Sequence, residues 1–200
     1  FALKESNPKR DEIWLFKKIP DNLQTNPIMV KRLCGIPGDT IQFHEGSLVV
    51  NGISINAILL RGDIISAGTL PYPSPLIFPN DTSLIQWSAL DFGPLWIPKK
   101  GVTIILNKLN LLLYRKYILN ESPSLIQTPN GDIAHGERIL AKYTFKQNYF
   151  FACGDNLALS NDSRHWGLIP ACNLMSKAKL VLFSIKRPFS NYKRLLRPIN

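Results

Sequence analysis

The sequence predicts a mostly β fold with few short helices, and three observations carry that prediction. Fifteen prolines and twelve glycines among 200 residues favour many turns over a helical bundle. The apolar runs are short and bounded by turn residues, which is typical of strands. Hydrophobic residues make up 45% of the chain and charged residues 19%, which supports a packed core and excludes a disordered chain. None of the apolar runs approaches the roughly 20 residues that a membrane-spanning helix needs.

The first quarter of the chain predicts four strands with clear boundaries. They are expected at residues 12–16, 28–36, 40–43 and 47–50. Pro37, Gly38 and Asp39 separate the second strand from the third. The pair Asn51-Gly52 follows the fourth strand, and this dipeptide between apolar residues predicts a hairpin with a type I′ turn.

The middle of the chain predicts an insertion and then one helix. Residues 68–100 hold six prolines, so we expect an irregular, extended segment whose aromatic rings (Phe78, Trp87, Phe92 and Trp96) form a small core of their own or rest at a lipid interface. The helix is expected at residues 109–119, ending at Asn120. Asn130-Gly131 predicts a second hairpin. Further strands are expected at residues 102–106, 144–153 and 178–185, followed by a basic tail.

The net charge indicates which partners the protein could bind, and the spacing of the cysteines and histidines indicates whether it could hold a metal. A net charge of +10 favours anionic partners, either lipid headgroups or nucleic acid, but no nucleic-acid recognition motif accompanies it. Cys34, Cys153 and Cys172 are widely spaced, so we expect three buried thiols rather than a zinc site. The three histidines share no ligand-like spacing and are interpreted as surface or loop residues. We therefore expect no metal site at these residues.

Lys31 interrupts the apolar strand predicted at residues 28–36. One interpretation is an edge strand with this lysine in solvent, because lysine is almost never buried unpaired. The alternative is a desolvated lysine. Since burial disfavours the ammonium form, such an amine is uncharged more readily and can accept a proton from a hydroxyl. Both interpretations stay open at this level.

A second polar cluster follows the strand predicted at residues 144–153. Gly154, Asp155 and Asn156 are followed by Ser160-Asn161-Asp162-Ser163-Arg164, and then by His165-Trp166-Gly167. One interpretation is a structural loop in which Asp162 and Arg164 satisfy backbone groups. The other is a site in which a serine orients a neutral lysine amine and an ion pair fixes the loop.

These two clusters resemble boxes of the bacterial type I signal peptidases, a family of serine endopeptidases with a Ser/Lys dyad. Lys31-Arg32 followed by Gly35-Ile36-Pro37-Gly38-Asp39 looks like the family's lysine-bearing box. Gly154-Asp155-Asn156 with the run from Ser160 to Pro170 looks like its last box, and Asn7-Pro8-Lys9-Arg10 resembles the segment before the lysine strand. Two long boxes in the same order are far more specific than one short motif.

The resemblance implies roles for particular residues of this chain. Lys31 stands where the family has its general base, and Ser160 matches the serine that binds the lysine amine. The positions that support the loop and the lysine strand are Arg32, Asp162, Ser163 and Arg164. The positions that flank the substrate groove are Met29, Val30 and Asn161, where an extended signal peptide would pair as an added strand.

The resemblance also implies an architecture, a reaction and a location. We expect a catalytic core formed by residues 1–52 and 144–187, an inserted β region at residues 53–143, and a basic tail at residues 188–200. The implied reaction is removal of signal peptides from secretory preproteins. It takes place at the cell inner membrane, with the catalytic domain on the periplasmic side. Lipid headgroups are expected partners and nucleic acid is not. The resemblance implies no metal and no organic cofactor.

One departure from the family keeps two readings open. The family's nucleophilic serine lies in a Ser-Met-x-Pro motif upstream of the first strand, and Ser6, the only serine before Lys31, falls in a polar turn. Leu157 and Leu159 replace the usual Arg and Asn, and Asp11-Glu12 replaces Gly-Asp. We expect the nucleophile upstream of Phe1. The alternative is a non-catalytic relative that binds extended peptides at the membrane.

Overall fold

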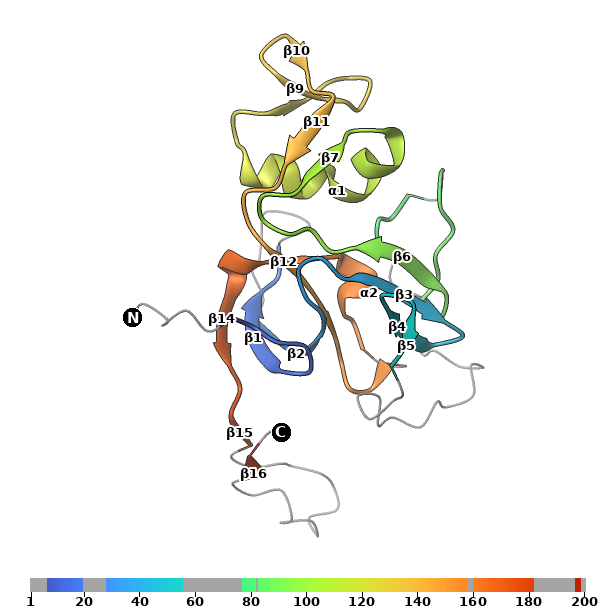
Figure 1. Ribbon diagram of the computed structural model, residues 1–200, viewed down its shortest axis with the longest axis vertical. Coiled ribbons are helices and arrows are strands. Elements are labelled where there is room, and N and C mark those ends of the chain that lie inside the picture. The colour runs from blue at the N-terminus through green and yellow to red at the C-terminus, as the bar shows by residue number, and fades with distance from the viewer. Residues whose placement is uncertain are drawn as a thin grey trace.

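A computed structural model describes residues 7–19, 28–55, 77–81, 83–157, 160–181 and 197–198. Short strands dominate them, joined by two α-helices and one short 3₁₀ segment, η2 (Ala171–Asn173). The mostly β class is therefore confirmed. Figure 1 shows the strands in a central body, with one longer helix and several short strands forming a separate tier at its upper end.

The sheet that carries Lys31 has five strands. Their order across the sheet is β13 (Ile169–Pro170), β12 (Tyr149–Cys153), β2 (Ile28–Gly35), β1 (Ile13–Lys17) and β14 (Leu174–Lys177). All neighbouring pairs are antiparallel. Strands from both ends of the chain thus lie side by side, and the lysine strand β2 is their centre.

The second sheet confirms the first predicted hairpin. Its order is β5 (Ile53–Ser54), β4 (Ser47–Val50), β3 (Thr40–His44) and β6 (Phe92–Trp96). Asn51 and Gly52 both have positive φ, 53° and 79°, as a type I′ turn requires. Strand β6 lies inside the proline-rich stretch expected to be irregular, and it pairs with β3.

The upper tier is formed by helix α1 (Lys108–Glu121) and two small sheets. Asn107 caps the helix start, where its side chain accepts a hydrogen bond from the backbone N–H of Asn110 at 2.8 Å. The predicted end at Asn120 is wrong. The helix continues to Glu121 because Pro123, which disfavours helical geometry in the residue before it, is the actual stop signal.

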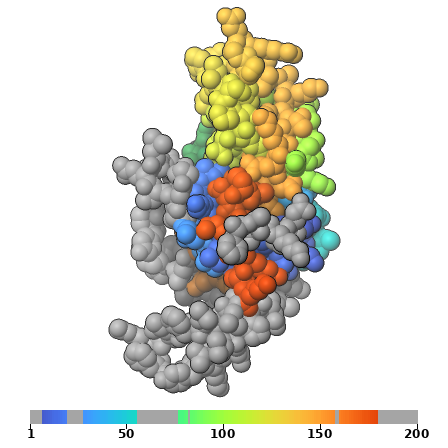
Figure 2. All heavy atoms as spheres, turned by 90° about the vertical axis from the view of Figure 1, so that its left-hand side faces the viewer, coloured from blue at the N-terminus to red at the C-terminus, as the bar shows by residue number. Residues whose placement is uncertain are grey.

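Five short strands complete this tier. One sheet contains β8 (Ile126–Gln127), β9 (Ile133–His135) and β10 (Arg138–Ile139), and the other pairs β7 (Thr103–Ile105) with β11 (Lys142–Thr144). The hairpin predicted around Asn130-Gly131 is confirmed, since β8 and β9 pair antiparallel. Figure 2 shows the helix in yellow and the residues around β9–β11 in orange, above the face formed by β1 and β14.

Two predicted strands differ from the structure. The long strand expected at residues 144–153 is divided into β11 and β12, because the chain bends at Lys146 and its two halves join different sheets. Of the strand expected at residues 178–185, the structure describes only the start, β15 (Leu180–Val181), which begins two residues later than expected and pairs with β16 (Arg197–Pro198). A separate strand, β14, precedes it. Residues 182–185, and most of the basic tail, lie outside the described residues.

The buried core crosses the predicted domain boundaries. Its larger cluster joins Ile41 and Phe43 of β3, Phe92 of β6, Tyr117 of α1 and Phe151 of β12. The aromatic rings of the insertion, which were predicted to form a small core of their own, instead belong to this larger cluster. Phe78 and Phe92 are buried in it, and Trp87 and Trp96 pack against it. The division into a catalytic core and an inserted region stays a prediction.

The burial of the cysteines and the lengths of the helices differ in part from what the sequence predicts. Cys34 and Cys153 are buried, as expected, whereas Cys172 is exposed. Helix α1 has 14 residues, which is longer than the short helices expected, and α2 (Ser163–Trp166) has four. In the described part of the chain, no helix combines the length and the apolar composition required to cross a bilayer.

Candidate active site

Lys31 lies on β2 and points to the face of the sheet that packs on the smaller hydrophobic cluster. Its direct neighbour across the strands is Trp14 of β1, and cross-strand neighbours share a face. Trp14, Leu33 and Trp166 are buried in that cluster. The lysine is therefore half-buried at the edge of an apolar floor, with its amine directed to the loop after β12.

The Lys31 amine meets Ser160. Lys31 Nζ donates a hydrogen bond of 3.1 Å to Ser160 Oγ, and the backbone N–H of Gly154 donates to the same oxygen at 3.1 Å. Ser160 is buried. The loop requires glycine at position 154, because a Cβ there would overlap Ser160 Oγ and lie 3.3 Å from Lys31 Nζ. The absent side chain is what allows amine, hydroxyl and backbone N–H to converge.

The loop that carries Ser160 is fixed by a buried ion pair. Arg164 Nε lies 2.9 Å from Asp162 Oδ1, and Arg164 Nη2 lies 2.9 Å from Asp162 Oδ2. Both residues are at most 1% exposed. Burial alone would lower the pKa of Arg164, but the Asp162 carboxylate reverses this and raises it. The guanidinium also donates hydrogen bonds to the backbone carbonyls of Ala89 and Leu157.

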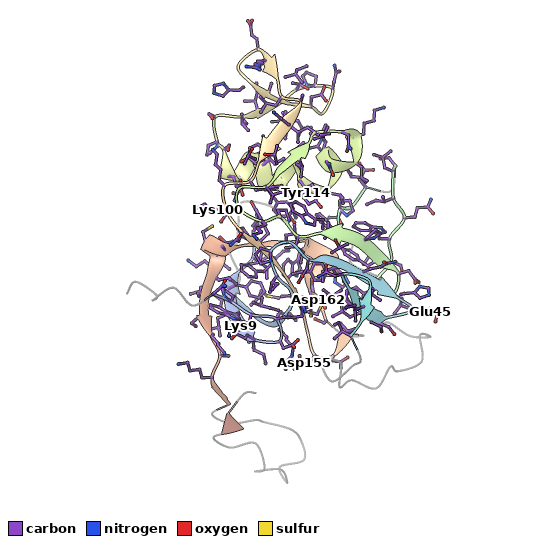
Figure 3. All side chains as sticks on the ribbon, in the orientation of Figure 1. Lys9, Glu45, Lys100, Tyr114, Asp155 and Asp162 are labelled. Carbon is purple, nitrogen blue, oxygen red and sulfur yellow. The ribbon has the colours of Figure 1, made fainter. Side chains whose placement is uncertain are left out.

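Ser163 and Asp162 also attach this loop to β12. Ser163 Oγ accepts a hydrogen bond from the backbone N–H of Ala152 at 3.0 Å. Asp162 Oδ2 accepts from the backbone N–H of Gly154 at 3.3 Å, so this single N–H is shared with Ser160 Oγ. Figure 3 shows Asp162 among the side chains of the central body and Asp155 at its lower rim.

Arg32, the residue after the lysine, holds the near end of the same loop. Its guanidinium binds Asp155 through two parallel hydrogen bonds of 2.8 and 2.9 Å and donates to the carbonyl of Asp11 at 2.7 Å. Hydrogen bonding to Asp155 raises the pKa of Arg32. Sequence reasoning did not name Asp155 as a site residue, although it stands in the quoted Gly154-Asp155-Asn156 motif.

An open pocket of about 350 Å³ borders the amine. It is lined by Ile13, Val30, Lys31, Arg32, Gly154, Asp155, Asn156 and Ser160. Strand β2 pairs with β1 along residues 28–32, but with β12 only at Arg32, Leu33 and Gly35. The other edge of residues 28–31 is consequently unpaired within the described residues. An extended chain could form backbone hydrogen bonds there.

The predicted groove residues take different positions along this edge. Val30 is 54% exposed and lines the pocket, and Met29 is half-buried, on the face of the sheet that Lys31 occupies. Asn161 is exposed next to Ser160. The structure thus brings Val30 and Ser160 to the pocket together with the lysine, whereas Met29 and Asn161 do not line it.

His165 is not the surface or loop residue that the sequence suggested. It lies in helix α2 with its side chain only 10% exposed, and its Nδ1 accepts a hydrogen bond from the backbone N–H of Asp162. Among the described residues, no group of three or more His, Cys, Asp or Glu side chains is arranged to hold a metal ion.

Two curated relatives are similar to most of this chain. "Signal peptidase I" of Aquifex aeolicus (strain VF5) is 26% identical over 192 residues, which cover 92% of this chain and 66% of the relative. "Signal peptidase I" of Buchnera aphidicola subsp. Schizaphis graminum (strain Sg) is 25% identical over 191 residues, covering 92% and 57%. The chain thus spans less than two thirds of the length of either relative.

One solved structure and one family model complete the comparisons. The crystal structure of a signal peptidase I from Enterococcus faecalis V583 is similar with a TM-score of 0.43 and 20% identity, covering 86% of this chain and 97% of the other. The family model described as "Signal peptidase, peptidase S26" matches residues 1–183, almost the whole sequence. With Lys31 and Ser160 in contact beside an open strand edge, the chain belongs to the signal peptidase family S26.

Proposed function

We propose that this chain is the lysine-bearing part of a serine endopeptidase that removes signal peptides from secretory preproteins. The contact between Lys31 Nζ and Ser160 Oγ, at the edge of an open pocket, is the observation that carries the proposal. The nucleophilic serine is expected upstream of Phe1. The family match does not favour the alternative of a non-catalytic peptide-binding relative.

In the proposed reaction Lys31 is the general base. A neutral amine has two N–H bonds and one lone pair, and donation of one N–H to Ser160 orients the lone pair. The amine takes the proton of the nucleophilic serine as its oxygen attacks the scissile carbonyl, and returns it to the departing amine of the mature protein. It then takes a proton from water as the water oxygen attacks the acyl-enzyme, and it returns that proton to the serine oxygen as the ester bond breaks.

The substrate is proposed to bind as an added strand along residues 28–31 of β2. Along this edge, which no described residue pairs with, the backbone offers donors and acceptors to an extended peptide, and the exposed side chain of Val30 lines the adjacent pocket. Small substrate side chains are the ones that the family resemblance implies, and the pocket proposed to receive them is lined by Ile13 and Gly154. Met29 and Asn161 are proposed to flank the bound peptide.

Membrane association is part of the same proposal. Ile28 and Val30 are 57% and 54% exposed on the face of β2 opposite Lys31, beside the edge proposed for the substrate. Exposed apolar residues next to a peptide groove suit an enzyme that meets its substrate at a lipid surface. We propose that the catalytic domain works at the inner membrane, on its periplasmic side.

The test is the substitution Lys31→Ala in the complete gene product. We expect processing of a preprotein to fall by at least about a thousandfold, since loss of a general base removes the whole dyad. The midpoint of thermal unfolding should stay within a few degrees, because Lys31 is only half-buried and its side chain makes a single hydrogen bond within the described residues. Quantitative cleavage of a purified preprotein and circular dichroism give the two measurements.

A matched control is Lys142→Ala, which removes an exposed lysine of β11. This variant should process the preprotein at the normal rate. Normal processing by Lys31→Ala would refute the proposed role of the lysine. A complete gene product that folds, contains no Ser-Met-x-Pro motif upstream of β1 and cleaves nothing would instead support the peptide-binding alternative.

A further inference from the structure

Helix α2 starts with a reciprocal pair of hydrogen bonds in which a histidine is the acceptor. Asp162 is the cap residue, and its carboxylate accepts from the backbone N–H of Arg164 at 3.2 Å. His165 Nδ1 accepts from the backbone N–H of Asp162 at 3.3 Å. An acceptor at Nδ1 must be unprotonated, so this bond requires the neutral imidazole with its proton on Nε2.

The bonds of Asp162 lead directly to the lysine amine. Asp162 Oδ2 and Ser160 Oγ share the backbone N–H of Gly154, at 3.3 and 3.1 Å. Ser160 Oγ in turn receives the Lys31 amine. Movement of the Asp162 backbone therefore changes how Gly154 and Ser160 meet, and with them the position of Lys31. The side chain of His165 holds this backbone in place, because its Nδ1 accepts the hydrogen bond of the Asp162 N–H.

Resting on the proposed function, we infer that His165 is a positioning residue of the site: its neutral imidazole holds the Asp162 cap in the geometry that keeps Ser160 against Lys31. Protonation of Nδ1 replaces the acceptor by a donor and breaks the bond to the Asp162 N–H. The protonated ring then turns to the Asp162 carboxylate, 3.9 Å away, and competes with Arg164 for it.

The charged groups around His165 determine which form prevails. Burial lowers the pKa of His165, the Asp162 carboxylate opposes this, and the positive charge of Arg164 lowers it further. The Lys31 amine acts in the same direction only in its protonated form. A histidine with a lowered pKa contributes stability that is present above about pH 6.5 and is lost as the pH falls, because the unfolded chain then binds the proton more tightly. The cap is therefore formed at neutral pH and is lost in acid.

Nuclear magnetic resonance of the nitrogen-15-labelled chain tests the cap without any measurement of catalysis. At about pH 7.5, well above the ordinary histidine pKa, we expect His165 to carry its proton on Nε2 alone. As the pH falls, the amide signals of Asp162 and Gly154 should shift with the same midpoint as the His165 ring. A proton on Nδ1 at that pH, or amide signals that do not follow the ring, would overturn the inference.

Two substitutions separate positioning from simple packing. The side-chain oxygen of His165→Asn can accept from the Asp162 N–H but cannot titrate, whereas His165→Phe fills the space and accepts nothing. We expect His165→Phe to lower kcat about fivefold to tenfold at neutral pH, the value of one lost hydrogen bond, with KM nearly unchanged. His165→Asn should restore most of the rate and remove the histidine's contribution to the acid limb of the pH profile.

The matched control is His135→Asn, an exposed histidine on β9. It should leave both the amide shifts and the pH profile unchanged. Equal kcat for His165→Phe and the unsubstituted enzyme would overturn the positioning role. A complete gene product that cleaves no preprotein would contradict the proposed function instead. The amide titration of Asp162 and Gly154 would still decide whether the cap exists.

Discussion

Two hydrogen-bonded clusters, one around the Asp162 carboxylate and one around the Glu121 carboxylate, can be compared directly, and the Asp162 cluster belongs to the candidate site. The Asp162 cluster comprises Asp162, Arg164, Ser160 and Gly154. The Glu121 cluster comprises Glu121, Ser122, Tyr143 and Tyr149. In the second, Glu121 accepts hydrogen bonds from Tyr143 at 2.8 Å, Tyr149 at 2.7 Å and the backbone N–H of Lys146 at 2.9 Å.

The difference between the clusters lies in what borders them. The Glu121 cluster joins the end of α1 to the bend at Lys146, and each of its donors ends on the carboxylate or on Ser122. The Asp162 cluster includes Ser160, which is in contact with Lys31 in an open pocket. Satisfied polar groups in a core are ordinary. The Asp162 cluster differs because a basic amine contacts it, beside a strand edge that has no partner in the described part of the chain. This combination distinguishes a candidate reaction centre from a structural brace.

The largest effect is expected from Arg164→Met, which tests the Asp162 cluster as a brace. The substitution leaves the Asp162 carboxylate buried without its cation, so the free energy of unfolding should fall by about 3–5 kcal/mol. Urea denaturation measures this value. The matched control Arg138→Met changes an exposed arginine of β10 and should alter stability by less than about 0.5 kcal/mol. A loss for Arg164→Met as small as the control's would show that the ion pair is not needed for the fold.

A smaller effect, in turnover rather than stability, is expected from Ser160→Ala. Removal of the hydroxyl deprives Lys31 of its acceptor, so processing by the complete gene product should fall about tenfold to a hundredfold. Tyr149→Phe makes the equivalent deletion in the Glu121 cluster. It should lower stability by about 1–2 kcal/mol and leave turnover unchanged. Equal losses of turnover in both variants would erase the distinction drawn between the clusters.

The smallest effect is a pH dependence that belongs to the Glu121 cluster. Burial raises the pKa of Tyr143 to about 12, and the Glu121 carboxylate that accepts its O–H acts in the same direction. A tyrosine with a raised pKa contributes stability below about pH 10, which is lost as the pH rises, since the unfolded chain releases the proton first.

Urea denaturation at intervals between about pH 9 and pH 11 measures this loss, and comparison with Tyr143→Phe isolates it. At about pH 11 we expect no more than about 1.4 kcal/mol of stability to be lost through this residue. The difference between the two proteins should narrow as the pH rises. A constant difference would mean that Tyr143 titrates alike in the folded and unfolded chain.

Local signals in the sequence predicted much of the fold, and they identified the two segments that contain Lys31 and Ser160. Asn51-Gly52 specified its own hairpin, because the left-handed conformation at both positions is a property of those two residues. The end of α1 was missed because Pro123 acts on its neighbour, whereas Asn120 continues the helix. The division of residues 144–153 was missed because no glycine or proline marks the bend at Lys146, and because β11 and β12 join different sheets.

The sequence by itself determined the class of the fold, its main turns and the two segments that carry Lys31 and Ser160. Only the tertiary structure decided that these residues meet, that Asp155 binds Arg32, and that His165 caps the loop from within. The physical reason is range. Turn preferences and strand patterns act over a few neighbouring residues, whereas the amine and the hydroxyl are 129 positions apart and are joined only by the packing of β2 against β12.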